Sequence, residues 1–507
     1  MSPRETPPVV RKTTAPAVHI FSGINLTRAR LEIGKTRKRC YGAGRTRRGL
    51  HRIIFEELAD MIKTTVLPKP KAGAGVLDLL RLFRQEEAAA DGYAALCLVK
   101  TKAVEPRLKA FEYLPTDTRR RPGPLSGIPV AIKDIIATSD MPTTNGSPIY
   151  RDHIPAADAW VVERLRNLGA TIFGKTVSTE FAWRHPGPTV NPWNTDHTPG
   201  GSSSGSAAAV AAGLVPLALG SQTLGSVIRP AAFNGIVGLK PSFGAIPRVG
   251  VHPLSPSLDH VGFFARRVDD VALALSLLAG ASDADPHGRP LPAFQVDIDR
   301  GIPPLDKPRL GIVRFKKFAR AEPAQQKVFD AAIARARDAG AILEELELAE
   351  FDSENWPAIN TILASEGAAI FASLLARYPD RTSDQLKMQV ERGRAVPATS
   401  YLAAKATQEK WRAALPTDIS GFDALLTLPA FGEALRGLDS TGDAEYCAPW
   451  TFIGAPAVTL PAGFGPNGLP LGIQIVGRYR EDLRVLRIAK WMEAALGFDP
   501  GIPGILS

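Results

Sequence analysis

The sequence predicts an α/β domain in which helices cover a β-sheet. From about residue 75 onward, helical and strand-like patterns alternate along the chain, which is typical of this class. No Pro/Gly-rich linker interrupts residues 75–507 for long enough to separate two domains. With 45% hydrophobic and 22% charged residues, the 507-residue chain has the composition of a globular protein that can bury a large core.

The first predicted elements include a strand that carries a lysine. "GIPVAIKDIIA" at 127–137 is an apolar, strand-like run that Lys133 interrupts. In 156–176, apolar residues recur at helical spacing up to Gly169, and a short buried strand follows.

Later elements repeat this pattern. The order of helix, glycine and strand recurs in 323–348. Near the end of the chain, 458–477 is predicted to form two strands joined by a Pro-Asn-Gly turn, followed by an amphipathic helix at 481–496. Residues 283–308 are rich in Asp, Pro and Gly and are predicted to form a surface loop.

The positive charge of the chain is concentrated at its N-terminus. Residues 1–52 hold 13 Lys and Arg against 2 acidic residues, whereas residues 53–507 hold 48 against 49. The Gly/Arg-rich arm lacks apolar periodicity, so we expect residues 1–60 to be a disordered extension and 61–507 to be the folded domain. Three other interpretations of the arm stay open: nucleic-acid binding, a targeting segment, or a spurious extension with Met61 as the true start. The neutral body disfavours nucleic acid as a partner.

The cysteines and the apolar segments bear on the compartment. Cys40, Cys97 and Cys447 are odd in number, lie far apart and form no C-x-x-C pair. This pattern argues against a disulfide framework and a zinc site, and it fits a cytoplasmic location. No run of about 18 apolar residues occurs, and the Ala-rich stretch 206–219 is too short to span a bilayer, so no membrane association is expected.

The run "TPGGSSSGSAAAVAAG" at 198–213 is either a flexible linker or a backbone cradle around reactive hydroxyls. Its second half has high helix propensity, and a Gly-rich turn that leads into a buried helix presents free backbone N–H groups. The run also matches G-x-S-x-G, the nucleophile elbow of α/β-hydrolases, with Ser203 in the middle. That motif needs a strand before it, whereas a loop with Pro192 and Pro199 precedes this one, which disfavours the elbow.

Lys133 admits two interpretations. A lysine in an apolar strand usually lies at a sheet edge and extends its ammonium to water. If Lys133 is instead buried, loss of solvation lowers its pKa, and the neutral amine can act as a general base. Such a base needs a hydroxyl to deprotonate, and the glycine-bounded serines in 198–213 and 220–230 are the best ones in the chain.

Four segments carry a family resemblance together. They are "GIPVAIKD" at 127–134, the serine-rich stretch 198–244, "SLDHVGFFARRVDDVALALSLLAG" at 257–280, and "TFIGAPAVTLPAGFGPNGLPLGIQIVGR" at 451–478. In this order they resemble the amidase signature family of Ser–Ser–Lys amide hydrolases. The resemblance extends over about 75–507. It implies a single catalytic domain around a large mixed β-sheet and an enzyme that requires no metal, nucleotide or organic cofactor.

By position, the resemblance implies Ser226 as the nucleophile, Ser202 as the bridging serine and Lys133 as the base. Ser202 and Ser226 are 24 residues apart, the separation that the family motif leads one to expect. Lys133 would draw a proton through Ser202 from Ser226 as Ser226 attacks an amide carbonyl, without any histidine. The resemblance also implies a cis peptide bond between Gly201 and Ser202. It places the oxyanion hole on the backbone N–H groups of Thr223, Leu224, Gly225 and Ser226.

The nucleophile segment departs from the commonest family pattern, GTDTGGSIR-x-P. Gln222 replaces an aspartate, Leu224 a glycine and Ile228 an arginine, with Arg229 one place later. Leu224 keeps its N–H, but it would be strained if the position requires a positive φ, and its bulk would narrow the acyl pocket.

Other polar and aromatic residues near these motifs are expected to have structural roles. We expect Ser203, Ser204 and Ser206 to bond the backbone or support Ser202, and Asp134 to be structural. We expect His185 to lie at the surface or to have its hydrogen bonds satisfied within the fold, and Trp183 and Trp450 to belong to the core.

Together, these observations predict an amidase that hydrolyses the C–N bond of a small carboxamide through an acyl-enzyme. Two alternatives stay open. One is the A-type subunit of a glutamine-dependent tRNA amidotransferase, whose usual motif Gln222 and Leu224 fit poorly; the other is a catalytically inactive binding protein on the same scaffold. Residues 350–450 are expected to line the substrate pocket, and a homodimer is compatible with the sequence.

Overall fold

The computed structural model describes residues 73–115 and 117–506, and these lie in one compact unit. The predicted extension, residues 1–60, and the alternative start at Met61 fall outside the described residues. The boundary at residue 60 therefore stays a prediction.

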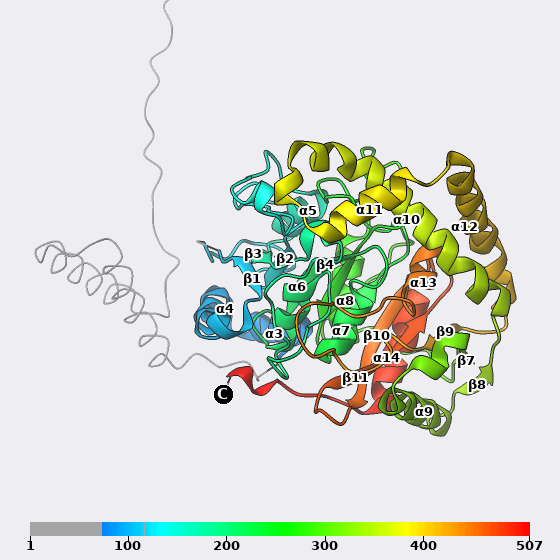
Figure 1. The fold of residues 1–507 in the computed structure, drawn as a ribbon. Helices are drawn as coiled ribbons and strands as arrows, with labels where there is room; N and C mark the ends of the chain where they lie inside the picture. The colour runs from blue at the N-terminus through cyan, green and yellow to red at the C-terminus, as the bar shows by residue number, and fades with distance from the viewer. Residues whose placement is uncertain (1–72, 116, 507) are drawn as a thin grey trace, which may run out of the picture. The chain divides into compact units, whose positions relative to one another are not determined.

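In the described part of the chain, eleven strands form one mixed sheet in the order β1-β3-β2-β4-β6-β5-β10-β11-β9-β7-β8 (Figure 1). Strand β2 pairs in parallel with β3 and β4, and β7 does so with β8 and β9, while all other neighbours are antiparallel. The predicted large mixed sheet is confirmed. The strands are β1 Phe111–Tyr113, β2 Pro129–Lys133, β3 Thr171–Thr176, β4 Leu217–Gln222, β5 Val237–Lys240, β6 His260–Ala265, β7 Arg309–Ile312, β8 Ile342–Glu345, β9 Ala424–Thr427, β10 Ala457–Phe464 and β11 Pro470–Val476.

Helices pack on this sheet in two groups. Helices α6 and α7 contact each other and the central strands, whereas α5, α8 and α14 form a second group in which α8 contacts both others. The helices are α3 Val76–Gln85, α4 Glu87–Leu108, α5 Trp160–Asn167, α6 Ser204–Ala211, α7 Ile228–Asn234, α8 Val268–Leu278, α9 Pro323–Asp338, α10 Ala349–Arg377, α11 Asp384–Arg394, α12 Ala398–Asp418, α13 Ala448–Phe452 and α14 Asp482–Leu496.

The predicted elements are found where the sequence places them. Helix α5 ends just before Gly169, whose φ of +84° suits glycine, and the buried strand β3 follows. Helix α9 and strand β8 repeat the order, and β10 and β11 form the predicted antiparallel hairpin ahead of α14. Residues 283–308 connect α8 to β7 without a helix or named strand of their own, as expected for a loop.

The surroundings of strand β2 determine whether the Lys133 side chain can reach water. It lies between β3 and β4, and all five of its residues are buried. Helix α6 contacts β2, β3 and β4. The helix approaches closely because Gly205 has no side chain: a Cβ there would lie 2.1 Å from the carbonyl oxygen of Ala110 and 2.6 Å from the amide nitrogen of Val177. The end of β2 is therefore sealed from water.

Helices α11 and α12 both pack against α10 beside the sheet (Figure 1). Helix α10 is the one described helix that is long and apolar enough to cross a membrane by composition, and 44% of its most apolar window is buried inside the fold. It also contacts α13, and a core helix of this length passes the same test.

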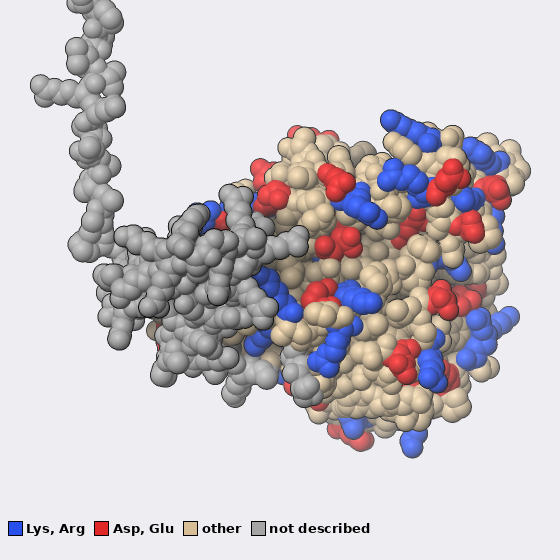
Figure 2. Space-filling view, turned by 60° about the vertical axis from the view of Figure 1, so that its left-hand side comes forward, with Lys and Arg blue, Asp and Glu red and all other residues tan. Residues whose placement is uncertain are grey.

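The surface carries charges of both signs. On the face shown in Figure 2, Lys and Arg side chains are interspersed with Asp and Glu among uncharged residues. This pattern agrees with the near-neutral composition of residues 53–507.

Candidate active site

Lys133 is the last residue of β2, and its side chain is completely buried. Its Nζ lies 2.6 Å from Ser202 Oγ and 2.8 Å from Ser221 Oγ. Burial lowers the pKa of Lys133 well below its usual range, and the negative charge of Asp259 opposes this lowering only in part. The interpretation of Lys133 as an edge lysine that reaches water is therefore wrong. A lysine held by two hydroxyls in a dry interior is suited to accept a proton.

Ser202 lies in the loop that leads into α6, and the Gly201–Ser202 peptide bond is cis, as the resemblance implied. The loop is held from both sides. Arg229 Nη2 donates to the Gly201 carbonyl at 2.6 Å, and Ser204 Oγ donates to the Gly200 carbonyl at 2.8 Å. All residues from 198 to 212 are buried, so the linker interpretation of this run is wrong.

The serines next to Ser202 bond the backbone, as expected. Ser203 Oγ donates to the carbonyl of Ser221 at 3.2 Å, and Ser206 Oγ to that of Leu219 at 2.8 Å. Ser203 is completely buried, and a loop rather than a strand precedes it. The structure thus excludes Ser203 as the nucleophile of an elbow.

Ser226 lies in the turn between β4 and α7 and is 8% exposed. Its hydroxyl makes no hydrogen bond to another described residue, and it faces the same cavity as Ser202. The backbone N–H groups of residues 223–226 likewise have no acceptor within the part of the chain that the structure describes. These four donors beside a free hydroxyl are available to an oxygen that carries developing negative charge.

The departures from the family pattern have physical explanations. The Gln222 amide oxygen accepts the N–H groups of Val227 and Ile228 at 2.8 and 3.0 Å, and its Nε2 donates to Thr451 Oγ1 at 3.0 Å. A neutral amide thus fixes the turn, and the apolar Ile228 is buried beside it. Replacing the aspartate and the arginine together means that neither position 222 nor position 228 carries a charge that would need a partner.

Leu224 and Gly225 complete this turn. Leu224 does not have a positive φ, so the strain that such a conformation would cause is absent, and its half-buried side chain lines the cavity. A Cβ on Gly225 would lie 3.0 Å from Arg229 Nη1 and 3.1 Å from the Cβ atoms of both Ala444 and Cys447, so a larger residue would be tightly packed here.

Asp259 links the nucleophile turn to residues 254 and 255. Its Oδ1 accepts the Thr223 hydroxyl at 2.6 Å, and its Oδ2 accepts the N–H groups of Leu254 and Ser255 at 2.8 and 2.9 Å. Burial nevertheless raises the pKa of this carboxyl. The negative charge of Asp259 favours the protonated form of Lys133 and so opposes the lowering of the Lys133 pKa by burial.

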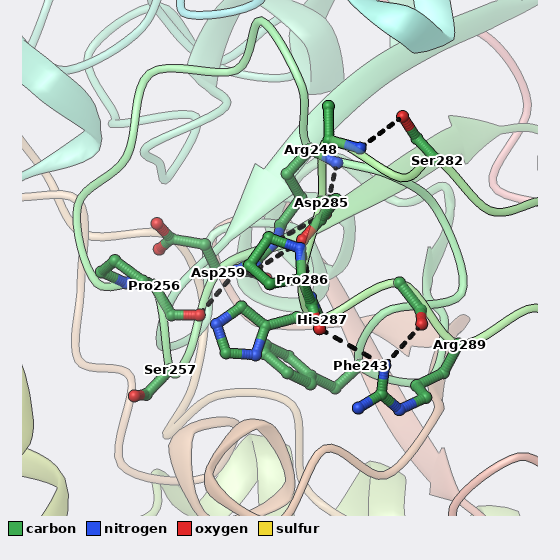
Figure 3. Close-up of polar contacts among 12 residues, drawn as sticks. Phe243, Arg248, Pro256, Ser257, Asp259, Ser282, Asp285, Pro286, His287 and Arg289 are labelled. Atoms are coloured by element: carbon green, nitrogen blue, oxygen red, sulfur yellow. Dashed lines mark hydrogen bonds and ion pairs between the residues drawn. The ribbon is translucent and has the colours of Figure 1, made fainter.

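Arg248 holds the segment that presents Asp259 (Figure 3). Its Nη1 donates to the carbonyls of Pro256 and Asp259 at 2.7 and 3.2 Å, and its Nη2 lies 3.4 Å from Asp285 Oδ1. Arg248 also lines a second cavity of about 380 Å³, and Ser221 and Thr223 are among the other residues that line it. Arg248 is therefore a positioning residue for the carboxylate beneath the turn.

A cavity of about 700 Å³ opens onto Ser202 and Ser226. The prediction that 350–450 would line it is confirmed, since its walls include Trp356, Gln385, Met388, Leu435, Thr441 and Asp443.

The residues expected to be structural have separate outcomes. Trp450 is completely buried in the core, whereas Trp183 also lines the large cavity, where its Nε1 donates to the Gln385 carbonyl at 3.1 Å. His185 is exposed, as expected. Asp134 pairs with Lys175 at 3.3 Å.

Sequence reasoning missed Ser221 and Asp259. Ser221 was visible in the stretch 220–230, but only the parallel pairing of β2 with β4 brings it to Lys133. Asp259 belongs to 257–280, one of the segments that carry the family resemblance, but its contact with Thr223 depends on the pairing of β4 with β6. Within the described residues, no group of three His, Cys, Asp or Glu side chains is placed to hold a metal ion.

Comparisons with known proteins agree with this fold. The model of the Amidase family matches residues 79–486. The chain is 36% identical over 466 residues to the A-type subunit of the glutamyl-tRNA(Gln) amidotransferase from Symbiobacterium thermophilum, and the match covers 81% of this chain and 94% of that protein.

Solved structures give the same result. The peptide amidase of Stenotrophomonas maltophilia superposes with a TM-score of 0.77 at 29% identity, over 85% of this chain and 99% of that one. The A-type subunit of the Thermotoga maritima glutamyl-tRNA(Gln) amidotransferase superposes with a TM-score of 0.72 at 28% identity, over 83% and 94%. The class that fold and site define is a hydrolase of amide C–N bonds. The chain belongs to the amidase family.

Proposed function

We propose that this chain is the amide-hydrolysing, A-type subunit of a glutamine-dependent tRNA amidotransferase. The observation that carries the chemistry is the buried Lys133, joined by a hydrogen bond to Ser202 beside the free hydroxyl and free N–H groups around Ser226. The substrate is supported by relatives of that name, which are 30–36% identical over most of their own length.

The proposed reaction uses these groups in sequence. Ser226 Oγ attacks the carboxamide carbon while its proton moves to Ser202, whose own proton moves to Lys133. The N–H groups of residues 223–226 stabilise the resulting oxyanion. Ser202 then returns a proton to the nitrogen, the C–N bond breaks, and ammonia leaves an acyl group on Ser226. Water attacks this acyl group, gives its proton to the same path, and releases the carboxylic acid.

The Ser202–Ser226 contact is open in the structure, although both hydroxyls face one cavity. Hydrogen bonds of this kind commonly tighten only when substrate is bound. We therefore assign the proton transfer between these serines to the substrate complex.

Ammonia release from glutamine tests the proposal. The purified chain is compared alone and together with the partner chains of the amidotransferase, and ammonia and glutamate are both measured. We expect glutamine turnover that increases strongly when the partner chains are present, and loss of that turnover in Ser226→Ala. Glutamine turnover at the same rate with and without the partner chains would count against a role within an amidotransferase.

Labelling tests the nucleophile independently of the substrate. A fluorophosphonate probe is expected to modify the parent chain at Ser226 and to leave Ser226→Ala unmodified. Labelling that persists in Ser226→Ala but disappears in Ser203→Ala would contradict the assignment.

A free-standing amidase is the second candidate, and the nucleophile turn favours it. Gln222, Leu224 and Ile228 depart from the commonest pattern, and the turn they build is complete without a partner chain. The superposition with a peptide amidase at 29% identity supports the same function. Hydrolysis of simple amides by the chain alone, with no response to partner chains, is the result expected for this candidate.

A further inference from the structure

Glu366 lies on α10, does not line the substrate cavity, and accepts four hydrogen bonds from uncharged donors. Its Oε2 accepts the Ser255 hydroxyl and, at 3.1 Å, the N–H group of Ser257. Its Oε1 accepts the Ser257 hydroxyl and, at 2.9 Å, the hydroxyl of Tyr401 on α12. Hydrogen bonds to an ionised carboxylate are stronger than neutral ones. Glu366 therefore fixes residues 255 and 257 to the helices beside the sheet.

Residues 254–259 connect Glu366 to the nucleophile turn. The hydroxyl of Ser255, which is completely buried, bonds Glu366, and its N–H group donates to Asp259 Oδ2 at 2.9 Å. Asp259 Oδ1 in turn accepts the Thr223 hydroxyl at 2.6 Å. The N–H group of Thr223 is one of the four donors that we assign to the oxyanion. A continuous series of hydrogen bonds thus runs from α10 to the turn that carries Ser226.

Arg248 also holds this segment, but it bonds different atoms. It donates to the carbonyls of Pro256 and Asp259 (Figure 3). Glu366 instead holds Ser255, whose N–H group bonds the Asp259 carboxylate. The carbonyl contacts of Arg248 would remain if Glu366 were lost, but Ser255 would no longer be fixed beneath the carboxylate that it bonds.

We propose that Glu366 is a positioning residue, which keeps Asp259 and therefore the Thr223 N–H group in the place that catalysis requires. This inference rests on the amide hydrolysis proposed above. It depends on the chemistry at Ser226 and not on the identity of the amide, so it applies equally to an amidotransferase subunit and to a free-standing amidase. Glu366 lies outside the four segments that carry the family resemblance.

The rate at which a fluorophosphonate labels Ser226 tests this role without an amide substrate. The rate constant is taken from the time course of labelling, so it does not depend on the fraction of the chain that is folded. We expect Glu366→Gln to be labelled about tenfold more slowly than the parent, because an N–H group replaces one acceptor oxygen and the oxyanion donor is displaced. Glu366→Asp keeps the charge on a shorter side chain and should lose less. A parental rate constant in Glu366→Gln would overturn the proposal.

Glu350→Gln is the matched control for the loss of a charge from α10. Glu350 is exposed and, like Glu366, links this helix to α12, since its Oε1 accepts a hydrogen bond from Lys410 Nζ at 2.6 Å. It has no part in the series that leads to Asp259. Glu350→Gln should therefore be labelled at the parental rate, and a loss equal to that in Glu366→Gln would contradict the specific role of Glu366.

The pH dependence of labelling separates positioning from a direct effect of the Glu366 charge. Labelling should become faster as Lys133 loses its proton, and the Asp259 charge raises the pKa of Lys133. Glu366→Gln should move the rising limb to lower pH, as Asp259→Asn does, but should cause no further shift in the Asp259→Asn chain. An equal shift in both chains would indicate a direct field and overturn the proposal. The other titratable groups near the two carboxylates are the same in every variant: Arg248, Asp285, Tyr401, Lys405 and Arg412.

Hydrogen exchange gives a readout that involves no reaction at Ser226. Glu366→Gln should raise the exchange rates of the N–H groups of Leu254 and Ser255, which bond Asp259, and Glu350→Gln should not. Parental exchange at both positions in Glu366→Gln would contradict the proposal. A parent chain that is neither labelled nor active on any amide, combined with faster exchange in Glu366→Gln, would refute the proposed function but not the link from Glu366 to Asp259.

Discussion

Lys133 and Lys175 are two completely buried lysines on neighbouring parallel strands, β2 and β3. Lys175 Nζ lies 3.3 Å from Asp134 Oδ1 and donates to the Ile136 carbonyl at 2.7 Å. Among the described residues, Lys133 Nζ bonds only the hydroxyls of Ser202 and Ser221. The two lysines therefore differ in their partners and not in their burial.

This difference separates a structural lysine from a reactive one. Burial lowers the pKa of Lys175 to about 8 and the adjacent Asp134 limits the shift, so Lys175 is mostly charged at neutral pH. For Lys133 burial dominates, and the pKa falls well below the usual value. A carboxylate partner preserves the ammonium, whereas hydroxyl partners leave a neutral base that can take their protons.

Replacing Lys133 should have the largest effect on catalysis. Lys133→Met is expected to lower kcat by at least about 10²–10⁴-fold, because the general base is lost. Its thermal stability should change little, since a neutral side chain of similar volume replaces one with no charged partner. Amide turnover and a thermal melt check both parts, and near-parental turnover would contradict the role of Lys133.

Replacing Lys175 should reverse this pattern. Lys175→Met leaves the Asp134 carboxylate buried without its partner and is expected to cost about 3–5 kcal/mol of unfolding free energy, measured by chemical denaturation. The fraction that remains folded should keep most of its activity per active site, titrated with a fluorophosphonate.

A double variant sharpens this result. Lys175→Met with Asp134→Asn removes both charges and should recover part of the lost stability, because no unpaired charge remains. If the double variant loses more unfolding free energy than the two single variants lose together, the ion pair does not explain the loss in Lys175→Met.

The hydroxyl partners of the two lysines give a smaller, matched test. Ser221→Ala removes one hydrogen-bond partner of Lys133 and is expected to lower kcat/KM about tenfold. Thr143→Val removes a hydroxyl that bonds Lys175 and should change stability by about 1 kcal/mol without a comparable loss of activity. Equal effects of both variants on kcat/KM would contradict the division between the two lysines.

The pH dependence of kcat/KM should respond to Asp259. Neutral Lys133 is the active form, so kcat/KM should rise as pH increases through the pKa of Lys133 and then level off. The Asp259 charge raises that pKa. Asp259→Asn should therefore move the rising limb to lower pH, and a limb that stays in place or moves to higher pH would contradict this electrostatic link.

Local patterns predicted much of the fold. The helix of 156–168, the strand of Lys133 and the hairpin of 458–477 follow from apolar spacing and from turn residues, which act over a few neighbours in the chain. The order of strands in the sheet was not predictable in this way, because it depends on pairings between distant segments.

In the candidate site, too, the sequence determined some features and the tertiary structure decided others. The sequence alone determined the residue types: a lysine within an apolar strand and two glycine-bounded serine stretches, with a family resemblance that assigns Lys133, Ser202 and Ser226 their roles. Only the tertiary structure decided that Lys133 is sealed from water and that Ser221 is its second partner. The physical reason is that solvation and charge pairing depend on every neighbour in space, whereas sequence patterns report only neighbours along the chain.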